Sequence, residues 1–316
     1  MRVPGAAYRI TYGKAGVPVH RVHAPPLRGL RAVPESAATG RPNVLFAHEI
    51  DVEVFGDNFL PAYTEGDNST VVATDSMKNF ILRLGLDSEA STLEGYLDDL
   101  GRRLLATYAQ MEGVRVAGRE LRFDAVPVPD GDGGFRPSDV LFSRHPGDHG
   151  VAVLRFGRVG DEVVAEDARG GRAGLELVKI TGSAFTQFVR DGWTTLPERR
   201  DRPLFIGLDV GWRYLDPADA SGRDPTRYVA SEQVRDVVAA VFEELVSESI
   251  QHLVNDMGAR VLERFGQLAE VSFDARNMTR DPVAVSDTDD RVRVYSDPFP
   301  AFGTITLTLR RQRTRA

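Results

Sequence analysis

Hydrophobic and polar positions alternate along residues 44–55, VLFAHEIDVEVF. One face of this segment would carry Val44, Phe46, His48, Ile50, Val52 and Val54. A period of two residues over this length predicts one long, half-buried strand. Farther along the chain, the polar sequence of residues 65–68 predicts a turn. A second, shorter strand is predicted at residues 70–73.

A helical period is present in two other regions. Ser91 and Glu94 have the spacing of a capping box, and an apolar stripe follows at the spacing of a helix. The stripe consists of Leu93, Leu97, Leu100, Leu104 and Tyr108. Residues 231–265 predict a long helical region, and the polar residues 247–249 divide it.

The rest of the chain predicts strands and loops. Residues 127–134 are rich in Pro, Gly and Asp and predict a loop, and residues 190–203 predict an irregular polar stretch. Further strands are predicted at residues 114–116, 121–123, 151–156, 162–165, 175–180, 292–295 and 305–309. Strands, a helix and strands follow one another twice, so we expect an α+β fold with mainly antiparallel sheets. The two similar units would cover residues 1–150 and 151–316.

Composition narrows the class of protein. The 316 residues include no cysteine, which excludes disulfides, thiolate zinc sites and cysteine nucleophiles. The N-terminal residues lack the apolar core of a signal peptide, and no apolar run reaches the roughly 18 residues of a membrane span. A net charge of −7 disfavours a general nucleic-acid partner. We therefore expect a cytoplasmic enzyme that binds neither membrane nor nucleic acid.

Lysine is rare in a chain with many arginines. It occurs only at Lys14, Lys78 and Lys179. Because an amine loses its proton near neutral pH far more readily than a guanidinium, lysines kept in such a background are candidates for positions that require an amine.

Residues 63–80, YTEGDNSTVVATDSMKNF, resemble the signature of the uricases (urate oxidases) over a long and nearly gapless stretch. Three further segments resemble the same family in the same order, namely residues 12–14 (YGK), 177–196 (LVKITGSAFTQFVRDGWTTL) and 209–214 (DVGWRY). The resemblance extends over nearly the whole chain. Residues 24–42 and 127–150 match it less well.

This resemblance implies two tunnelling-fold (T-fold) units in tandem. Each unit is expected to be an antiparallel four-stranded sheet with two helices on one face. Four chains of a uricase form a homotetramer with a hollow barrel, and residues from two neighbouring subunits meet at each active site. The resemblance also implies an oxidoreductase that oxidises a planar nitrogen heterocycle with O2 and uses no metal and no cofactor.

The resemblance assigns four residues to substrate binding in the second half of the chain. Arg202 corresponds to an arginine that clamps the ring anion, because a guanidinium fork binds adjacent oxygen and nitrogen atoms. Gln251 corresponds to a clamping glutamine, and the backbone N–H of Ile250 to a donor for a ring carbonyl. Phe185 corresponds to the phenylalanine that stacks on the ring. Without the resemblance, each would be interpreted as a surface or core residue.

In the first half, Lys14 and Thr74 correspond to a catalytic dyad, and Asp75 lies beside them at the substrate edge. A lysine whose pKa is lowered by burial would take a proton through the threonine hydroxyl. The alternative is a surface lysine after a turn and an ordinary strand threonine. Asp67 and Asn68 are interpreted as turn formers.

The chain departs from the family at an Asn-x-His motif. One register places Ala275 at the asparagine and Asn277 at the histidine, and a second places Asn277 at the asparagine and Thr279 at the histidine. Neither register supplies a histidine, and a carboxamide does not carry protons near neutral pH as imidazole does. Asn277 is retained as a candidate catalytic residue.

Three functions remain open. The first is an oxidase for a urate-like heterocycle in specialised metabolism, which the altered motif favours. The second is an ordinary urate oxidase, which converts urate and O2 to 5-hydroxyisourate and H2O2. The third is a ligand-binding protein that keeps the fold without the oxidase reaction.

The histidines do not form a recognisable metal site. His145 and His149 flank a segment that contains Pro146 and Gly147, and His20 and His23 lack the third ligand that zinc requires. His48 lies on the apolar face of its strand and is interpreted as a core residue. No metal is therefore expected.

Overall fold

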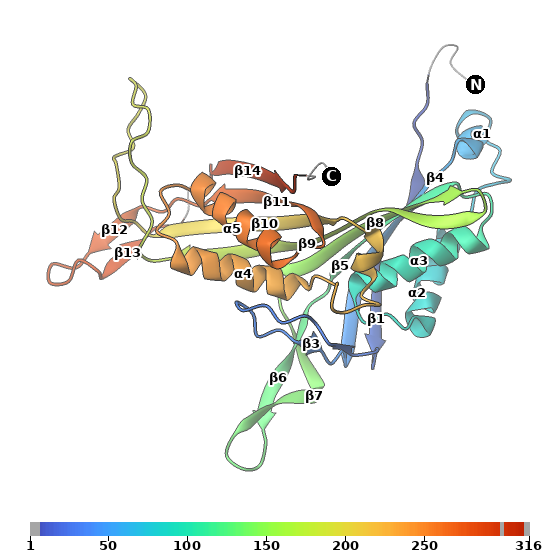
Figure 1. Ribbon diagram of the computed structural model, residues 1–316, viewed down its shortest axis with the longest axis horizontal. Helices are drawn as coiled ribbons and strands as arrows, with labels where there is room; N and C mark the ends of the chain where they lie inside the picture. The colour runs from blue at the N-terminus through green and yellow to red at the C-terminus, as the bar shows by residue number, and fades with distance from the viewer. Residues whose placement is uncertain (1–6, 298–299, 313–316) are drawn as a thin grey trace. The chain divides into compact units, whose positions relative to one another are not determined.

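The computed structural model describes residues 7–297 and 300–312. It is an α+β structure with a large antiparallel sheet, as the sequence predicts (Figure 1). The chain divides into two units. Unit 1 contains the described residues up to Ala32, Ala38–Gly170 and Arg213–Ala230. Unit 2 contains Val33–Ala37, Gly171–Trp212 and the described residues from Ser231 onward.

Four antiparallel strands form the sheet of unit 1 in the order β1-β4-β5-β8. They are β1 (Tyr12–Val22), β4 (Leu45–Phe55), β5 (Gly113–Glu120) and β8 (His149–Val159). The alternation predicted for residues 44–55 is confirmed, because Ile50, Val52 and Val54 on β4 are at most 1% exposed. His48 on the same face is 2% exposed, as expected of a core residue.

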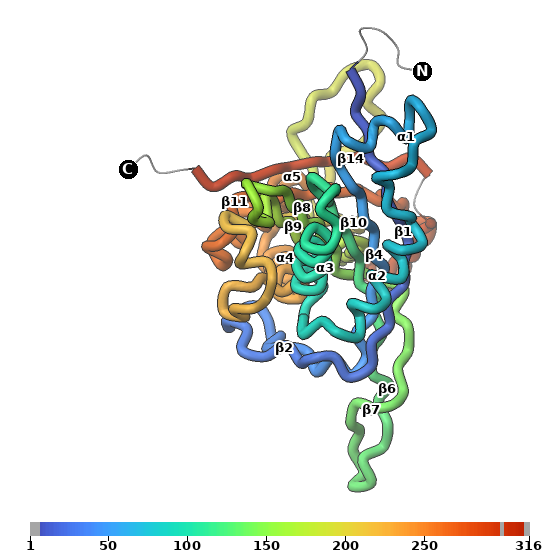
Figure 2. Tube along the Cα trace, turned by 90° about the vertical axis from the view of Figure 1, so that its right-hand side faces the viewer, coloured from blue at the N-terminus to red at the C-terminus, as the bar shows by residue number. Residues whose placement is uncertain are grey.

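Helices α2 (Thr74–Asp87) and α3 (Leu93–Thr107) cover one face of these strands (Figures 1 and 2). The predicted stripe on α3 faces the sheet, where Leu97, Leu100 and Leu104 are fully buried. Burying a leucine side chain contributes roughly 1.5–3 kcal/mol, so this stripe supplies much of the core of unit 1. The smaller elements of unit 1 are β2 (Leu27–Arg28), β3 (Gly40–Arg41), η1 (Asp57–Phe59), α1 (Leu60–Thr64), β6 (Phe123–Pro129), β7 (Phe135–Arg144) and η2 (Pro217–Ser221).

Strand β9 (Glu162–Lys179) begins in unit 1 and ends in unit 2. Unit 2 continues the order with β10 (Leu204–Tyr214), β11 (Leu268–Asn277) and β14 (Gly303–Arg310), and β12 (Pro282–Val285) pairs with β13 (Arg293–Tyr295). Helices α4 (Ser231–Glu244) and α5 (Ile250–Arg264) pack on each other, and α5 packs on β11 and β14. The predicted division of residues 231–265 is confirmed, because Ser249 caps α5 by accepting a hydrogen bond from the backbone N–H of His252 at 3.1 Å.

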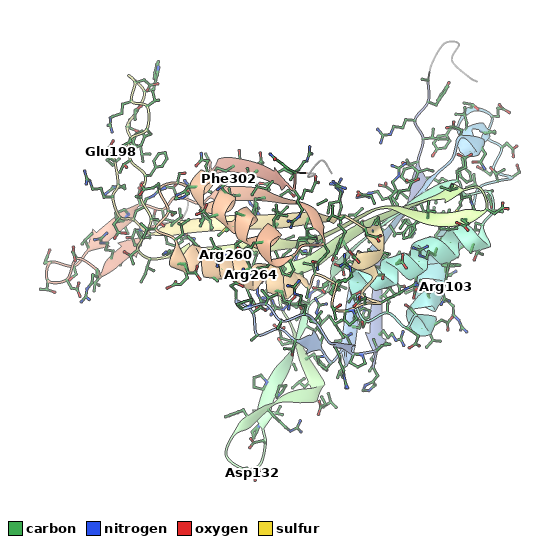
Figure 3. All side chains as sticks on the ribbon, in the orientation of Figure 1. Arg103, Asp132, Glu198, Arg260, Arg264 and Phe302 are labelled. Carbon is green, nitrogen blue, oxygen red and sulfur yellow. The ribbon has the colours of Figure 1, made fainter. Side chains whose placement is uncertain are left out.

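A short segment, Val33–Ala37, is bound to the helices of unit 2. The Glu35 carboxylate accepts hydrogen bonds from Arg260 at 3.0 Å and from Arg264 at 2.7 Å. Figure 3 labels these two arginines, which lie about one turn apart on α5. Ser36 donates to the carboxylate of Asp236 on α4 at 2.6 Å. These contacts hold the segment against both helices.

Two predictions in unit 1 were wrong. Residues 70–73 are not a strand but the approach to α2, whose buried Met77, Ile81 and Leu84 have helical spacing. Ala73 precedes this helix without a side-chain cap, so the usual start signal is absent from the sequence. The cap of α3 is Thr92 and not Ser91, because the Thr92 hydroxyl accepts from the backbone N–H of Gly95 at 3.0 Å.

Three strand and loop boundaries also differ from the predictions. Residues 130–134 form the predicted loop, but residues 127–129 lie in β6, which pairs with β7 in a two-stranded hairpin where prolines are tolerated because the pairing has free edges. Residues 162–165 and 175–180 belong mostly to the single strand β9, whose glycine-rich middle interrupts the hydrophobic pattern. Residues 121–122 lie between β5 and β6. No helix in the described part of the chain combines the length and the apolar character needed to cross a membrane.

Candidate active site

A cavity of about 140 Å³ in unit 2 brings together five of the candidate site residues. It lies where the segment after β9, the start of α5, the end of β11 and the start of β14 converge. Its wall consists of Phe185, Leu196, Arg202, Ile250, Gln251, Asn277, Thr279, Gly303 and Ile305. A second cavity of about 110 Å³ shares Leu196, Arg202, Asn277 and Thr279 with it.

Arg202 supplies the positive charge of this cavity. Its guanidinium carbon lies 5.6 Å from the centre of the Phe185 ring. Its Nε is buried and has no hydrogen-bond partner among the described residues. Burial lowers the pKa of Arg202, and the nearby charge of Arg199 lowers it further. Because a guanidinium stays protonated at neutral pH, this unpaired buried donor favours an anionic acceptor.

Phe185 provides a flat apolar surface beside Arg202. Its ring stacks on the ring of Phe188, with centroids 4.9 Å apart and an interplanar angle of 10°. The backbone of Phe185 pairs with that of Arg199 through two hydrogen bonds of 2.8 and 3.0 Å. The ring is therefore held in place at the cavity wall.

The first turn of α5 carries Ile250 and Gln251. Ile250 is 4% exposed, whereas the side chain of Gln251 is exposed at the cavity. The first N–H groups of a helix have no intrahelical acceptor, and the helix dipole makes this end partly positive. This end of α5 therefore offers an amide side chain and backbone donors to an electronegative ligand.

Asn277, at the end of β11, lies at the cavity, whereas Ala275 does not line it. Ala275 is fully buried and pairs with Ile305, whereas Asn277 pairs with Gly303 and lines the cavity. Thr279 lines it as well. None of the described residues that line the cavity is a histidine.

The other three candidate residues lie in unit 1. Lys14 is on β1 opposite Val52, at the start of a bulge in the β1–β4 pairing. Gly13 precedes it, and a Cβ at this position would lie 1.8 Å from the carbonyl oxygen of Val52. This close approach explains why glycine stands before Lys14.

Thr74 and Asp75 begin α2 and are both exposed. Asp75 accepts hydrogen bonds from Lys78 at 2.5 Å and Asn79 at 3.0 Å on its own helix. The hydrogen bond from Lys78 is the main cause of the lowered pKa of Asp75, and the charge of Lys14 contributes as well. Lys14 and Asp75 are therefore within electrostatic reach of each other.

The loop before α2 is attached to β1. The Tyr12 hydroxyl accepts a hydrogen bond from the backbone N–H of Val72 at 3.1 Å. Asp67 accepts from the backbone N–H of Ser69 at 2.9 Å, so Asp67 forms a turn as predicted. These contacts bring the start of α2 to the strand that carries Lys14.

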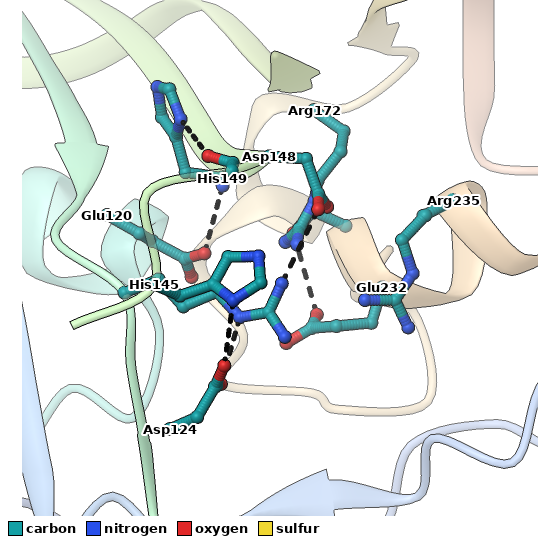
Figure 4. A network of polar contacts seen from close by, with 12 residues as sticks. Glu120, Asp124, His145, Asp148, His149, Arg172, Glu232 and Arg235 are labelled. Atoms are coloured by element: carbon teal, nitrogen blue, oxygen red, sulfur yellow. Dashed lines mark hydrogen bonds and ion pairs between the residues drawn. The ribbon is translucent and has the colours of Figure 1, made fainter. Parts of the chain in front are cut away.

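His48 and His145 have contacts that are typical of structural residues. Burial lowers the pKa of His48 to about 3, so its ring is neutral. His145 faces Asp124, with 3.1 Å between Nδ1 and the carboxylate (Figure 4). Within residues 7–297 and 300–312, no group of three or more His, Asp or Glu side chains is arranged to hold a metal ion.

Comparisons with known proteins identify the family of the chain. The sequence model of the family described as uricase matches residues 56–152 and 168–306. The chain is 49% identical to the uricase of Haloferax volcanii over 92% of this chain and 94% of that protein. It is 40% identical to the uric acid degradation bifunctional protein PucL of Bacillus subtilis, over 93% of this chain and 59% of that protein.

Solved structures give the same result. The crystal structure of the urate oxidase of Bacillus sp. TB-90 superimposes with a TM-score of 0.93 at 37% identity, over 96% of this chain and 100% of that chain. The urate oxidase of Bacillus subtilis superimposes with a TM-score of 0.81 at 33% identity. In sequence and in fold, this chain belongs to the uricase family of oxidoreductases.

Proposed function

We propose that this protein is an ordinary urate oxidase. The reaction takes urate, O2 and water to 5-hydroxyisourate and H2O2, with no metal and no cofactor. Urate gives two electrons and two protons to O2, and water adds to the oxidised ring. The observation that carries the proposal is the convergence of Phe185, Arg202, Ile250, Gln251 and Asn277 on one cavity. The similar proteins named uricase or urate oxidase favour urate over another heterocycle.

Substrate binding is assigned to the unit 2 cavity. Arg202 would donate hydrogen bonds to adjacent electronegative atoms of the urate anion, and charge-assisted bonds of this type are roughly twice as strong as neutral ones. The Gln251 amide both donates and accepts, which suits an imide edge. The backbone N–H of Ile250 would bind a ring carbonyl. Phe185 would stack on the purine at the centroid separation of about 4.5–7 Å common for aromatic pairs.

Proton transfer is assigned to Lys14 and Thr74 of unit 1, with Asp75 beside them. The lysine amine would receive a substrate proton through the threonine hydroxyl. We propose that these residues come from a neighbouring subunit of a homotetramer built from tandem T-fold units, residues 1–150 and 151–316. The small volume of the unit 2 cavity supports this, because ligand pockets are typically about 300–1,000 Å³.

Asn277 and Thr279 are assigned to the oxygen side of the ring. The Asn277 carboxamide would hold O2 or the attacking water, and the Thr279 hydroxyl would pass a proton between waters. A hydroxyl donates and accepts at once, so it relays a proton without becoming charged. This assignment lets the chain carry out the reaction without a histidine.

A direct assay with urate tests the proposal. Loss of urate absorbance, O2 uptake and H2O2 release should occur in equal amounts without added metal or cofactor. Stoichiometric turnover is the expected outcome. Tight binding of urate without O2 uptake would contradict the oxidase assignment and leave a ligand-binding protein.

A further inference from the structure

The segment that follows β9 folds back on itself within unit 2. The backbone N–H of Arg202 donates to the carbonyl of Ser183 at 2.8 Å, close to where Phe185 pairs with Arg199. Phe185 and Arg202 therefore lie on two adjacent arms of one loop. Residues 179–183, KITGS, form the base of this loop, and no part of the proposed reaction uses them directly.

Asp201 fastens the two arms at this base. Its carboxylate accepts from the backbone N–H of Gly182 at 2.7 Å, and both of its oxygens lie 3.0 Å from the Thr181 hydroxyl. Gly182 has a φ of +79°, which glycine adopts without steric cost. Because Asp201 directly precedes Arg202, these bonds set the direction in which the Arg202 side chain leaves the backbone.

A buried serine pair joins this loop to the connection between α4 and α5. Ser183 and Ser247 are each 1% exposed, and their hydroxyl oxygens lie 3.2 Å apart. The backbone N–H of Ala184 donates to the carbonyl of Ser247 at 2.8 Å. Since Ser247 lies three residues before Ile250, the loop is tied to the start of α5.

Lys179, at the end of β9, joins the base of this loop to the C-terminal end of α4. Its ammonium group donates to the carbonyls of Phe242, Glu243 and Leu245 at 2.8–3.0 Å. These carbonyls belong to the C-terminal end of α4, where a cation is favoured by the helix dipole. Three donors on one atom match three carbonyls, which gives a structural reason for a lysine at this position.

We propose that Asp201 is a positioning residue for urate binding, acting through Arg202. It binds Thr181 and Gly182 at the base of the loop, and the contacts of Ser183, Ser247 and Lys179 hold this base against α4 and the start of α5. The inference rests on the proposed function. It predicts that the carboxylate contributes through hydrogen bonds it accepts and not through contact with the substrate. Asp201 lines the adjacent cavity of about 110 Å³ and not the cavity that holds Phe185, Ile250 and Gln251.

The first test compares single variants by kcat and KM for urate at saturating O2. Asp201→Ala should raise KM by about tenfold, the effect of losing one or two hydrogen bonds to a charged group, and should change kcat less. Asp201→Asn should stay within about threefold of the wild type, because a carboxamide oxygen accepts the same bonds. Equal KM in Asp201→Ala and the wild type would overturn the proposal, as would an equal defect in the two variants.

Asp191 supplies a matched control in the same loop. Its carboxylate accepts from the backbone N–H of Trp193 at 3.0 Å and from the Thr194 hydroxyl at 2.9 Å, without a connection to Arg202. Asp191→Ala should leave KM within about twofold of the wild type, the change expected of an exposed turn. A defect equal to that of Asp201→Ala would show that general loosening of the loop explains both.

A double variant tests the route of action. If Asp201 acts through Arg202, kcat/KM of Arg202→Ala and of the Asp201→Ala/Arg202→Ala double variant should agree within about twofold. Multiplied losses would overturn the proposal. Thr181→Val removes one bond to Asp201 and should raise KM severalfold, which keeps the test available if Asp201→Ala does not fold. If the wild type itself does not turn over urate, the proposed function fails, whereas turnover with an unaffected Asp201→Ala defeats only this inference.

Discussion

The two halves of the proposed active site differ in how far a single unit organises them. In unit 2, Phe185, Arg202 and Gln251 share one cavity, and the Arg202 Nε is buried without an acceptor among the residues that the structure describes. In unit 1, Thr74 and Asp75 are exposed, and Asp75 is paired with Lys78 of its own helix. The ring-binding half is preorganised, whereas the proton-transfer half remains open to solvent.

This difference has a physical basis. An unpaired buried guanidinium raises the free energy of the empty site, and an anionic ligand recovers that cost on binding. A preorganised loop also lowers the entropy lost when the ligand is immobilised. Thr74 is exposed and Lys14 is only partly buried, so neither carries a comparable desolvation cost. Substitutions in the two halves should therefore produce different kinetic defects.

Arg202→Ala should have the largest effect. Loss of two charge-assisted hydrogen bonds, each worth roughly 1.5–3 kcal/mol, should lower kcat/KM for urate by about a thousandfold or more. Steady-state kinetics measures this loss, and Arg200→Ala, at an exposed neighbouring position, should stay near the wild type. A loss of less than tenfold would remove Arg202 from the substrate clamp.

Lys14→Met should mainly lower kcat, by about a hundred- to ten-thousandfold as expected for loss of a general base, with KM within severalfold of the wild type. The matched control is Lys78→Met, because Lys78 pairs with Asp75 and is not assigned to proton transfer. A pure increase in KM would move Lys14 from the chemical step to binding.

Mixed tetramers sharpen the comparison further. Lys14→Met and Arg202→Ala subunits are each defective in one half of the site. If each site combines unit 1 of one subunit with unit 2 of its neighbour, random mixing should restore about one quarter of the sites. Co-expression and activity per tetramer provide the measurement. Mixed tetramers as inactive as the parents would place both halves within one subunit.

Each unit contains a carboxyl group with a shifted pKa, and the two shifts have opposite directions. Glu94 on α3 is 4% exposed and accepts a hydrogen bond from the Tyr228 hydroxyl at 2.8 Å. Burial raises the pKa of Glu94 to about 7. The ordinary pKa of a glutamate carboxyl group is 4.5. The contribution of Glu94 to the free energy of unfolding is therefore present below pH 4.5 and is lost as the pH rises to about 7. The loss is on the order of 3 kcal/mol at about 1.4 kcal/mol per pKa unit.

Glu94→Gln should abolish this pH dependence, because the amide is neutral at every pH and still accepts from Tyr228. Urea unfolding between pH 4.5 and 8 measures the free energy of unfolding. An unchanged slope in the variant would assign the pH dependence to another group.

The smallest change in stability is expected at Glu35 of unit 2, whose pKa is lowered and not raised. Hydrogen bonds from Arg264, ahead of those from Arg260, lower the pKa of Glu35 to about 2. This stabilisation is present above pH 4.5 and is lost as the pH falls toward 2. Glu35→Gln should cost roughly 1–3 kcal/mol at pH 7 and less near pH 2, measured by denaturant unfolding. A constant cost at both pH values would contradict the ion-pair explanation.

Local pattern predicted the elements whose periodicity is strong and whose ends are marked. β4, α3 and the α4–α5 pair were recognisable because one face of each is continuously apolar. α2 and β9 were not, because α2 starts without a side-chain cap and glycines interrupt the apolar pattern of β9. In both, tertiary packing outweighs the local signal.

The candidate site residues came from the family resemblance and not from periodicity, since an isolated arginine, glutamine or phenylalanine has no local pattern that marks a ligand site. The contacts of Lys179 were not visible in the sequence, because the carbonyl groups that bind it are more than 60 residues away. Only the fold brings such partners within hydrogen-bond distance.

By itself, the sequence determined the fold class, the main amphipathic elements and the family, because these follow from patterns of neighbouring residues. The tertiary structure decided that Asn277 and not Ala275 lines the cavity. Both residues point to the same face of β11, since strand side chains repeat every two positions. Ala275 is fully buried in the core while Asn277 ends the strand beyond it, and where a core stops is set by packing between distant segments.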